Sequence, residues 1–169
     1  MDFLGKHCKE IILIKGNHDT ILGPIAQKRN VKVLDYYLIK NSKVPILKKS
    51  IIKKSFKKIK DNKNILVTHG DKIPNIKLLN EVSTIIIGHE HPAVSIKEGP
   101  RVELFKCYLA GKWKNKDLIA QPSFNLVVEG TDVLKEEILS PFLHQNLGNF
   151  NVFVVADKVY GFGKLKNLF

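Results

Sequence analysis

Four of the six histidines in this chain directly follow short apolar runs, beside glycine and oxygen-bearing side chains. The clearest case is Gly88-His89-Glu90-His91, which ends the apolar run 83–87. Two other runs, 11–14 and 64–67, lead into Gly16-Asn17-His18-Asp19 and His69-Gly70-Asp71. A β-branched run that stops at glycine predicts a buried strand whose exit turn lies at the sheet edge, where open α/β sheets bind ligands. Imidazoles gathered at such an edge indicate a metal site.

Strands are expected to position each of these turns. The apolar runs predict strands at 11–15, 64–67 and 83–87, together with one or two strands within 31–39. Helices are expected at 2–10 and 73–79. In the second half, β segments are expected at 93–96, 102–109, 118–121, 124–128, 151–155 and 159–162, with a turn over 111–117 and an irregular or briefly helical stretch at 133–144. We therefore predict an α/β fold whose C-terminal half forms a second, mostly antiparallel sheet.

Composition sets the class of protein. The chain has 169 residues, 44% of them hydrophobic, which suits one domain with its own core. Charged residues make up 26%, and no apolar run approaches the roughly 18 residues of a membrane span. The N-terminus lacks a signal-peptide pattern, so a cytoplasmic protein without a membrane partner is expected. Cys8 and Cys107 are too few and too far apart for a disulfide framework or a zinc ribbon.

The formal net charge is +12, which attracts polyanions such as nucleic acids. Arginine occurs only at Arg29 and Arg101, so the charge is almost entirely lysine, whereas bidentate phosphate or guanine recognition favours arginine. An AT-rich coding bias or a hot habitat is the slightly favoured explanation of the lysine content. The basic stretch 40–63 predicts a short amphipathic helix with Ile52, Phe56 and Ile59 on one face. Its lysine face is interpreted first as solvated surface, and second as a nucleic-acid or membrane patch.

The histidine-bearing turns, in this order and each after a strand, resemble the last three sequence blocks of the calcineurin-like metallophosphoesterases. The similarity runs from about residue 9 to the C-terminus. The later segments resemble one subgroup of this family, the predicted phosphoesterases related to the bacterial DNA-ligase-associated metallophosphoesterases. The segments that carry this narrower resemblance are Pro92, Lys106-Cys107-Tyr108-Leu109, Pro122-Ser123-Phe124-Asn125 and Gly130-Thr131-Asp132. The resemblance implies a layered α/β/β/α sandwich of two mixed sheets.

The resemblance also implies a site with two divalent ions. Asn17, His69 and His89 would bind one ion and His91 the other, while His18 would face the phosphate and assist the leaving oxygen. Asp19, Asp71 and Glu90 would support the ligands or the turns. Manganese is expected first, with iron, zinc or nickel as alternatives. Two such ions, about 3.5–4 Å apart, acidify a shared water and clamp the phosphoryl oxygens.

The implied activity is metal-dependent hydrolysis of phosphomonoesters or phosphodiesters, with nucleic acid and small molecules both open as substrates. The alternative is a catalytically inactive, lysine-rich protein that binds nucleic acid or another partner and keeps a degenerate metal site. Salt separates the two, because binding through 40–63 should weaken steeply as salt rises. Metal-dependent turnover should instead vanish with a chelator or on His89→Ala.

The chain departs from the family pattern at its start. Two earlier blocks, Asp-x-His and Gly-Asp, have no counterpart, although they normally supply the bridging carboxylate and two ligands of one metal. We expect a single domain over 1–169 that lacks a βαβ portion of about 30 residues or more. Met1 is the only methionine, so an upstream non-ATG start is one explanation, and a short protein that is inactive or completed by a partner is the other. An apolar strand edge beside 11–15 would then favour self-association.

Overall fold

The computed structural model describes residues 2–40 and 64–168. The basic segment 41–63, with its predicted helix, lies outside the described residues. Within them the helices are α1 (Asp2–His7), α2 (Leu22–Lys28), α3 (Ile76–Asn80) and the 3-10 turn η1 (Leu165–Asn167). The strands are β1 (Ile12–Ile14), β2 (Lys32–Leu34), β3 (Tyr36–Ile39), β4 (Asn64–Thr68), β5 (Val82–Ile87), β6 (Pro92–Glu98), β7 (Arg101–Trp113), β8 (Lys116–Ala120), β9 (Thr131–Asp132), β10 (Asn151–Val155) and β11 (Val159–Lys164).

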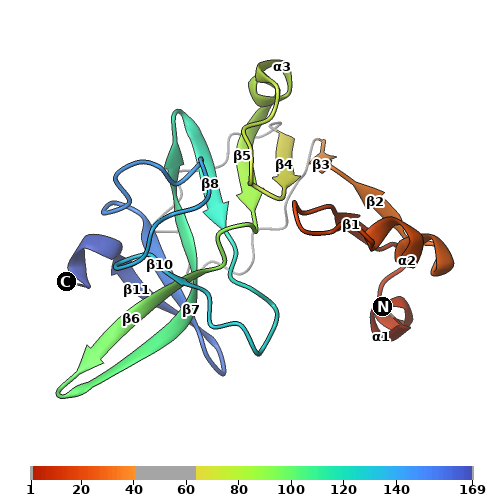
Figure 1. Cartoon of the computed structure of the whole chain (residues 1–169). Coiled ribbons are helices and arrows are strands. Elements are labelled where there is room, and N and C mark those ends of the chain that lie inside the picture. Colours follow the sequence, from red (N-terminus) through yellow and green to blue (C-terminus); the bar gives the residue numbers. More distant parts are fainter. Residues whose placement is uncertain (1, 41–63, 169) are drawn as a thin grey trace.

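Nine of these strands form one mixed sheet, in the order β11-β10-β7-β8-β5-β4-β3, with β6 paired to β7 and β9 paired to β6 (Figure 1). The predicted α/β class is therefore confirmed. The strands of the C-terminal half, expected in a separate sheet, join the first half through the parallel pair β5–β8. They remain mostly antiparallel to one another, because β7 pairs in that sense with β6, β8 and β10.

The strand that leads into the turn 88–91, β5, is the most deeply buried. Four of the six residues of β5 are buried, and the apolar run 85–87 favours a strand covered on both faces. Its neighbour β4 runs parallel to it, so the C-terminal ends of both strands lie at the same edge. By contrast, β10 alternates between buried and half-buried residues, as expected for a strand with one face on the core.

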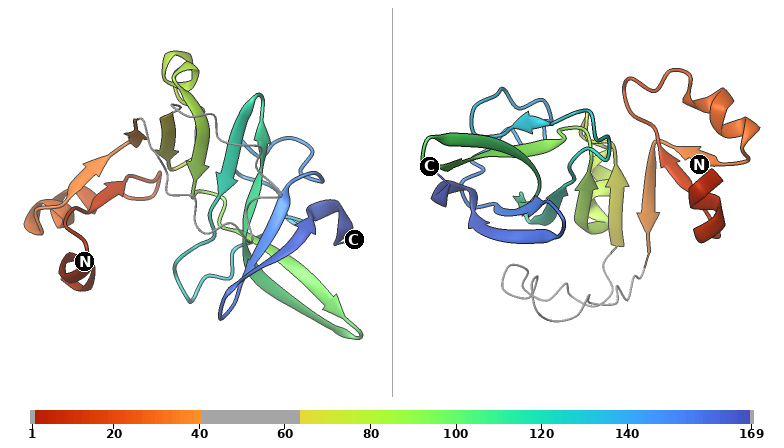
Figure 2. Two further views of the ribbon diagram at one scale, coloured as in Figure 1. Left: turned by 180° about the vertical axis from the view of Figure 1, so that it is seen from behind. Right: turned by 90° about the horizontal axis from the view of Figure 1, so that it is seen from below.

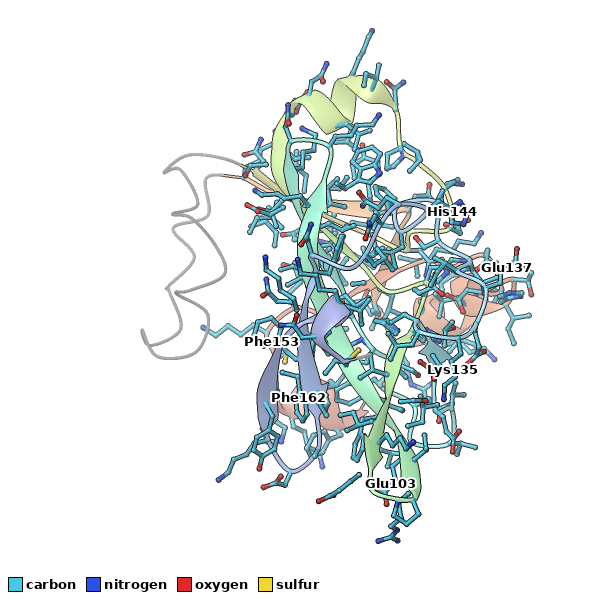
Figure 3. The ribbon with its side chains drawn as sticks, turned by 90° about the vertical axis from the view of Figure 1, so that its left-hand side faces the viewer. Glu103, Lys135, Glu137, His144, Phe153 and Phe162 are labelled. Carbon is cyan, nitrogen blue, oxygen red and sulfur yellow. The ribbon has the colours of Figure 1, made fainter. Side chains whose placement is uncertain are left out.

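The long strand β7 belongs to two regions of the sheet. Residues 101–106 pair with β6, while residues 107–113 pair with β10 and β8. The resulting β6–β7 hairpin extends away from the rest of the sheet, with Glu103 near its tip (Figures 1 and 3). This division of β7 is consistent with an α/β sandwich.

The N-terminal elements α1, β1, α2 and β2 gather at one end of the molecule, and the C-terminal strands lie at the other (Figure 2). Among the described residues, β1 pairs only with β2, in parallel, and its three residues are only half-buried. Self-association through this strand stays a prediction. Helix α2 accommodates Pro24 because this residue falls in the first turn, where its missing N–H leaves no helical hydrogen bond unmade.

The core lies along the large sheet and is completed by the irregular segment 133–150. Phe142 and Leu143 of that segment are buried, and Phe142 packs against Trp113 with ring centroids 5.0 Å apart. The fully buried apolar side chains of the sheet include those of Leu66, Ile85, Leu109, Leu118 and Val152. Within residues 2–40 and 64–168, no helix is long and apolar enough to cross a bilayer.

Two local predictions were wrong. The expected turn over 111–117 is only two residues long, because β7 continues to Trp113 and Lys114 adopts a positive φ of 52°. The segment 124–128 is irregular rather than a strand. Its backbone N–H groups donate to local side chains, Asn125 to Ser123 Oγ and Val127 to Asn125 Oδ1, which leaves Phe124 and Leu126 exposed. Such side-chain bonds compete with a strand ladder.

Candidate metal centre

Three potential metal ligands meet beyond the ends of β1, β4 and β5. Asn17 Oδ1 lies 2.9 Å from His69 Nε2, and His69 Nε2 lies 3.0 Å from His89 Nδ1. The two imidazole rings meet edge to face, with centroids 4.8 Å apart. The structure therefore brings together the three residues that the family resemblance assigned to one metal.

Backbone hydrogen bonds hold the two histidine turns against each other. The carbonyl oxygen of His69 accepts from the N–H groups of Gly88 and His89, at 2.9 and 2.8 Å. The turns are packed closely as well, because a Cβ on Gly70 would lie 2.7 Å from the Cβ of Ile87. The parallel pairing of β4 and β5 thus continues into the turns as a fixed contact.

The turn after β1 needs glycine in order to approach His69. A Cβ on Gly16 would lie 2.9 Å from His69 Cε1, so a side chain there would displace the ring. The Gly16 N–H donates to Asp19 Oδ2 at 2.8 Å, which closes the turn and presents Asn17. Asp19 therefore stabilises the turn, a role in keeping with the one implied by the family resemblance.

The geometry of the three donors fits a bound transition-metal ion. Ligands about 2.1 Å from a metal lie about 3.0 Å apart when they subtend a right angle, close to the two separations observed. Without a cation, an unprotonated His69 Nε2 would direct its lone pair at the Asn17 oxygen, which is also an acceptor. A protonated Nε2 could donate its single hydrogen to either Asn17 Oδ1 or His89 Nδ1, but not well to both. A metal would resolve this conflict, because the three atoms could then all donate lone pairs to one cation. Two imidazoles and an amide oxygen suit Mn, Fe, Zn or Ni.

Electrostatics favour the neutral, ligating form of the imidazoles. Burial, and secondarily the charge of His89, hold the pKa of His69 below its ordinary value of 6.5. Burial and His89 likewise lower the pKa of His91. Since only neutral imidazole binds a metal, a lowered pKa keeps these side chains available at neutral pH.

Glu90, which lies between His89 and His91, is a buried carboxylate with 1% of its surface exposed. Its Oε2 accepts the N–H groups of Leu139 and Ser140, at 3.0 and 2.7 Å. Its Oε1 has no hydrogen-bond partner within the described ranges. A buried carboxylate with an unpaired oxygen is costly unless positive charge lies near it, so Glu90 also suits a cation at this turn.

The other two predicted site residues, His18 and His91, are not hydrogen-bonded to this cluster within the described residues. His91 is half-buried and has a positive φ of 49°, a conformation held by the bond from the Thr131 N–H to its carbonyl. His18 is exposed beside Asn17. No hydrogen bond in residues 2–40 and 64–168 joins either side chain to the three converging ligands, so their roles as second-metal ligand and catalytic group stay predictions.

Sequence reasoning missed the contribution of Ser140. Its backbone and hydroxyl contact both histidine turns, but it lies 50 residues beyond Glu90 in an irregular stretch, where no pattern signals a site. The position of Glu90 between two histidines pointed to a supporting role in the sequence. Its hydrogen bonds to the backbone of Leu139 and Ser140 could not be predicted from the sequence. Over the described part of the chain, no three His, Cys, Asp or Glu side chains form a metal-binding group, so the candidate centre depends on the amide of Asn17. No family model, curated protein or solved structure matches this chain.

Proposed function

We propose that this chain is a metal-dependent phosphoesterase of the calcineurin-like class, acting on phosphomonoesters or phosphodiesters. The observation that supports this proposal is the convergence of Asn17 Oδ1, His69 Nε2 and His89 Nδ1. These atoms come from three turns far apart in the sequence, each at the end of a strand. The same three residues match the one-metal ligand set of the family that the sequence blocks resemble.

A divalent metal in this centre would supply Lewis-acid polarisation of a phosphoryl oxygen and a water of lowered pKa. Asn17, His69 and His89 are neutral donors, so they would leave the positive charge of the site available to an anionic phosphate. His18 is exposed on the turn that presents Asn17, where it can give a proton to the leaving oxygen. His91 follows Glu90 in the same turn and is the candidate ligand for a second ion.

The net charge of +12 supports an anionic substrate, since a positive field raises the encounter rate with phosphate esters. It does not separate nucleic acid from small phosphoesters. The different-class alternative, a lysine-rich binding protein with a degenerate metal site, draws on the same charge and predicts binding without turnover.

The test is Mn²⁺ binding and hydrolysis of bis-p-nitrophenyl phosphate by the full chain, by His89→Ala and by His7→Ala. His7 is a matched control because it is exposed on α1 and its ring contacts only that of Phe3 in the same helix, at a tilt of 52°, among the ring contacts of the described residues. We expect His89→Ala to lose both metal binding and turnover, and His7→Ala to keep both. Metal binding without turnover by the wild-type chain would favour the binding protein, and equal activity of the two variants would refute the site.

A further inference from the structure

Ser140 contacts both histidine turns from a distant part of the chain. Its hydroxyl donates to the carbonyl oxygen of Gly70 at 2.8 Å, and its backbone N–H donates to Glu90 Oε2 at 2.7 Å. Gly70 follows His69 directly, and Glu90 follows His89 directly. Both bonds are fully buried. A single residue therefore tethers the two turns whose imidazoles lie 3.0 Å apart.

The position of Ser140 is itself fixed by the core. Phe142 and Leu143, two and three residues further on, are 0% and 1% exposed, and the Leu143 N–H donates to the Ser140 carbonyl at 2.9 Å. The neighbouring Leu139 N–H adds a second bond to Glu90 Oε2. In Figure 3 the labelled Lys135, Glu137 and His144 mark the course of this segment, on the opposite side from Phe153 and Phe162. The tether is thus anchored in packed side chains rather than in a mobile loop.

We propose that Ser140 is a positioning residue for the candidate metal centre, which sets the separation of His69 and His89 by fastening Gly70 and Glu90. This inference rests on the proposed function, because it assumes that the two imidazoles share an ion. Ser140 touches neither the ligating atoms nor a substrate. It acts through the two turns, as supporting residues do that orient metal ligands in other proteins.

The decisive comparison is between Ser140→Ala and Ser83→Ala. Ser140→Ala removes the bond to Gly70 and leaves the backbone bond to Glu90 in place. Ser83 is a matched control on β5, because its hydroxyl is also buried but has no hydrogen-bond partner within the described ranges. For each chain we would measure the Mn²⁺ dissociation constant at 25 °C, the Co²⁺ absorption spectrum and the urea midpoint.

We expect Ser140→Ala to weaken Mn²⁺ binding by about 10-fold to 100-fold, the range found for residues that support metal ligands. Its Co²⁺ spectrum should also change, because that spectrum reports the ligand geometry. Ser83→Ala should leave the dissociation constant and the spectrum as in the wild type. A merely structural role would lower the urea midpoint of Ser140→Ala and leave the affinity and spectrum of the folded protein unchanged.

The outcomes separate this inference from the proposed function. If the wild-type chain binds neither ion, both fail. If it binds and Ser140→Ala binds equally well with the same spectrum, only the positioning role is refuted. Should Ser140→Ala not fold, hydrogen exchange in the wild type decides, because binding and positioning are reciprocally linked. Mn²⁺ should then slow exchange of the Leu139 and Ser140 amides more than that of the β10–β11 hairpin, and an equal effect on both would overturn the proposal.

Discussion

Replacing Gly70 by alanine tests the close packing of the two histidine turns. Gly70 has a φ of +101°, which side chains rarely adopt, and forcing alanine into it costs about 1–3 kcal/mol. The new Cβ would also lie 2.7 Å from the Cβ of Ile87, and overpacking of this kind costs about 1–3 kcal/mol. We therefore expect the free energy of unfolding to fall by about 2–6 kcal/mol.

The two contributions can be separated with Gly99→Ala. Gly99 also has a positive φ, of 59°, but a Cβ there would meet nothing within 4 Å. This control should lose only the backbone part, about 1–2 kcal/mol. Urea unfolding followed by the fluorescence of Trp113, the single tryptophan, measures both variants on the same scale, provided that the slope with denaturant is unchanged.

The steric part should also reach the metal centre. Because the contact involves the Cβ of Ile87, trimming Ile87 to valine cannot relieve it, so the backbone of one turn must shift. His69 precedes Gly70 and Gly88 follows Ile87, so the separation of the imidazoles should change and Mn²⁺ affinity should fall. A Gly70→Ala variant that is no less stable than Gly99→Ala and binds Mn²⁺ like the wild type would refute this reasoning.

Three further results are expected. In metal-free protein, the free energy of unfolding should fall as pH drops below about 6.5, because the lowered pKa values of His69 and His91 let the unfolded chain bind protons that the folded chain does not. Urea titrations at several pH values measure this dependence, and a flat profile would contradict it. The exposed Cys8 should react with a thiol reagent in the native state, whereas Cys107 should react only in denaturant, because burial raises its pKa to about 12. Fast reaction of both thiols in the native protein would contradict the burial of Cys107. Phe142→Ala should lower the free energy of unfolding by about 3–5 kcal/mol, and a loss below about 1 kcal/mol would show that this side chain is not part of the core.

The fold class and the meeting of the two histidine turns after β4 and β5 were predictable because they depend on local signals. Apolar runs of strand length mark β4 and β5, and their shared edge follows from parallel pairing. The turn residues that end the strands indicated a metal site, and the resemblance to a known family then implied Asn17, His69 and His89 as ligands of one ion. The strand predictions use neighbouring residues and one rule about where strand ends meet, whereas the ligand set depends on the resemblance.

What was not predictable depends on contacts that no local pattern records. The run at 124–128 has a strand-like composition, yet the Ser123 and Asn125 side chains divert its backbone N–H groups. The pairing of β5 with β8 joins segments separated by a hairpin, and alternation in the sequence cannot specify that neighbour. The bond from Ser140 to Gly70 spans 70 residues and is fixed only when the core forms.

The tether from Ser140 also orders events during synthesis. In the proposed centre all three metal donors precede Glu90 in the sequence, whereas Ser140 lies 50 residues beyond it. Contacts between distant residues form slowly and need both segments to be present, so the donors would be made before their spacing is set. A metal ion would then meet the final ligand geometry only after segment 133–150 has emerged and Ser140 has bonded to Gly70.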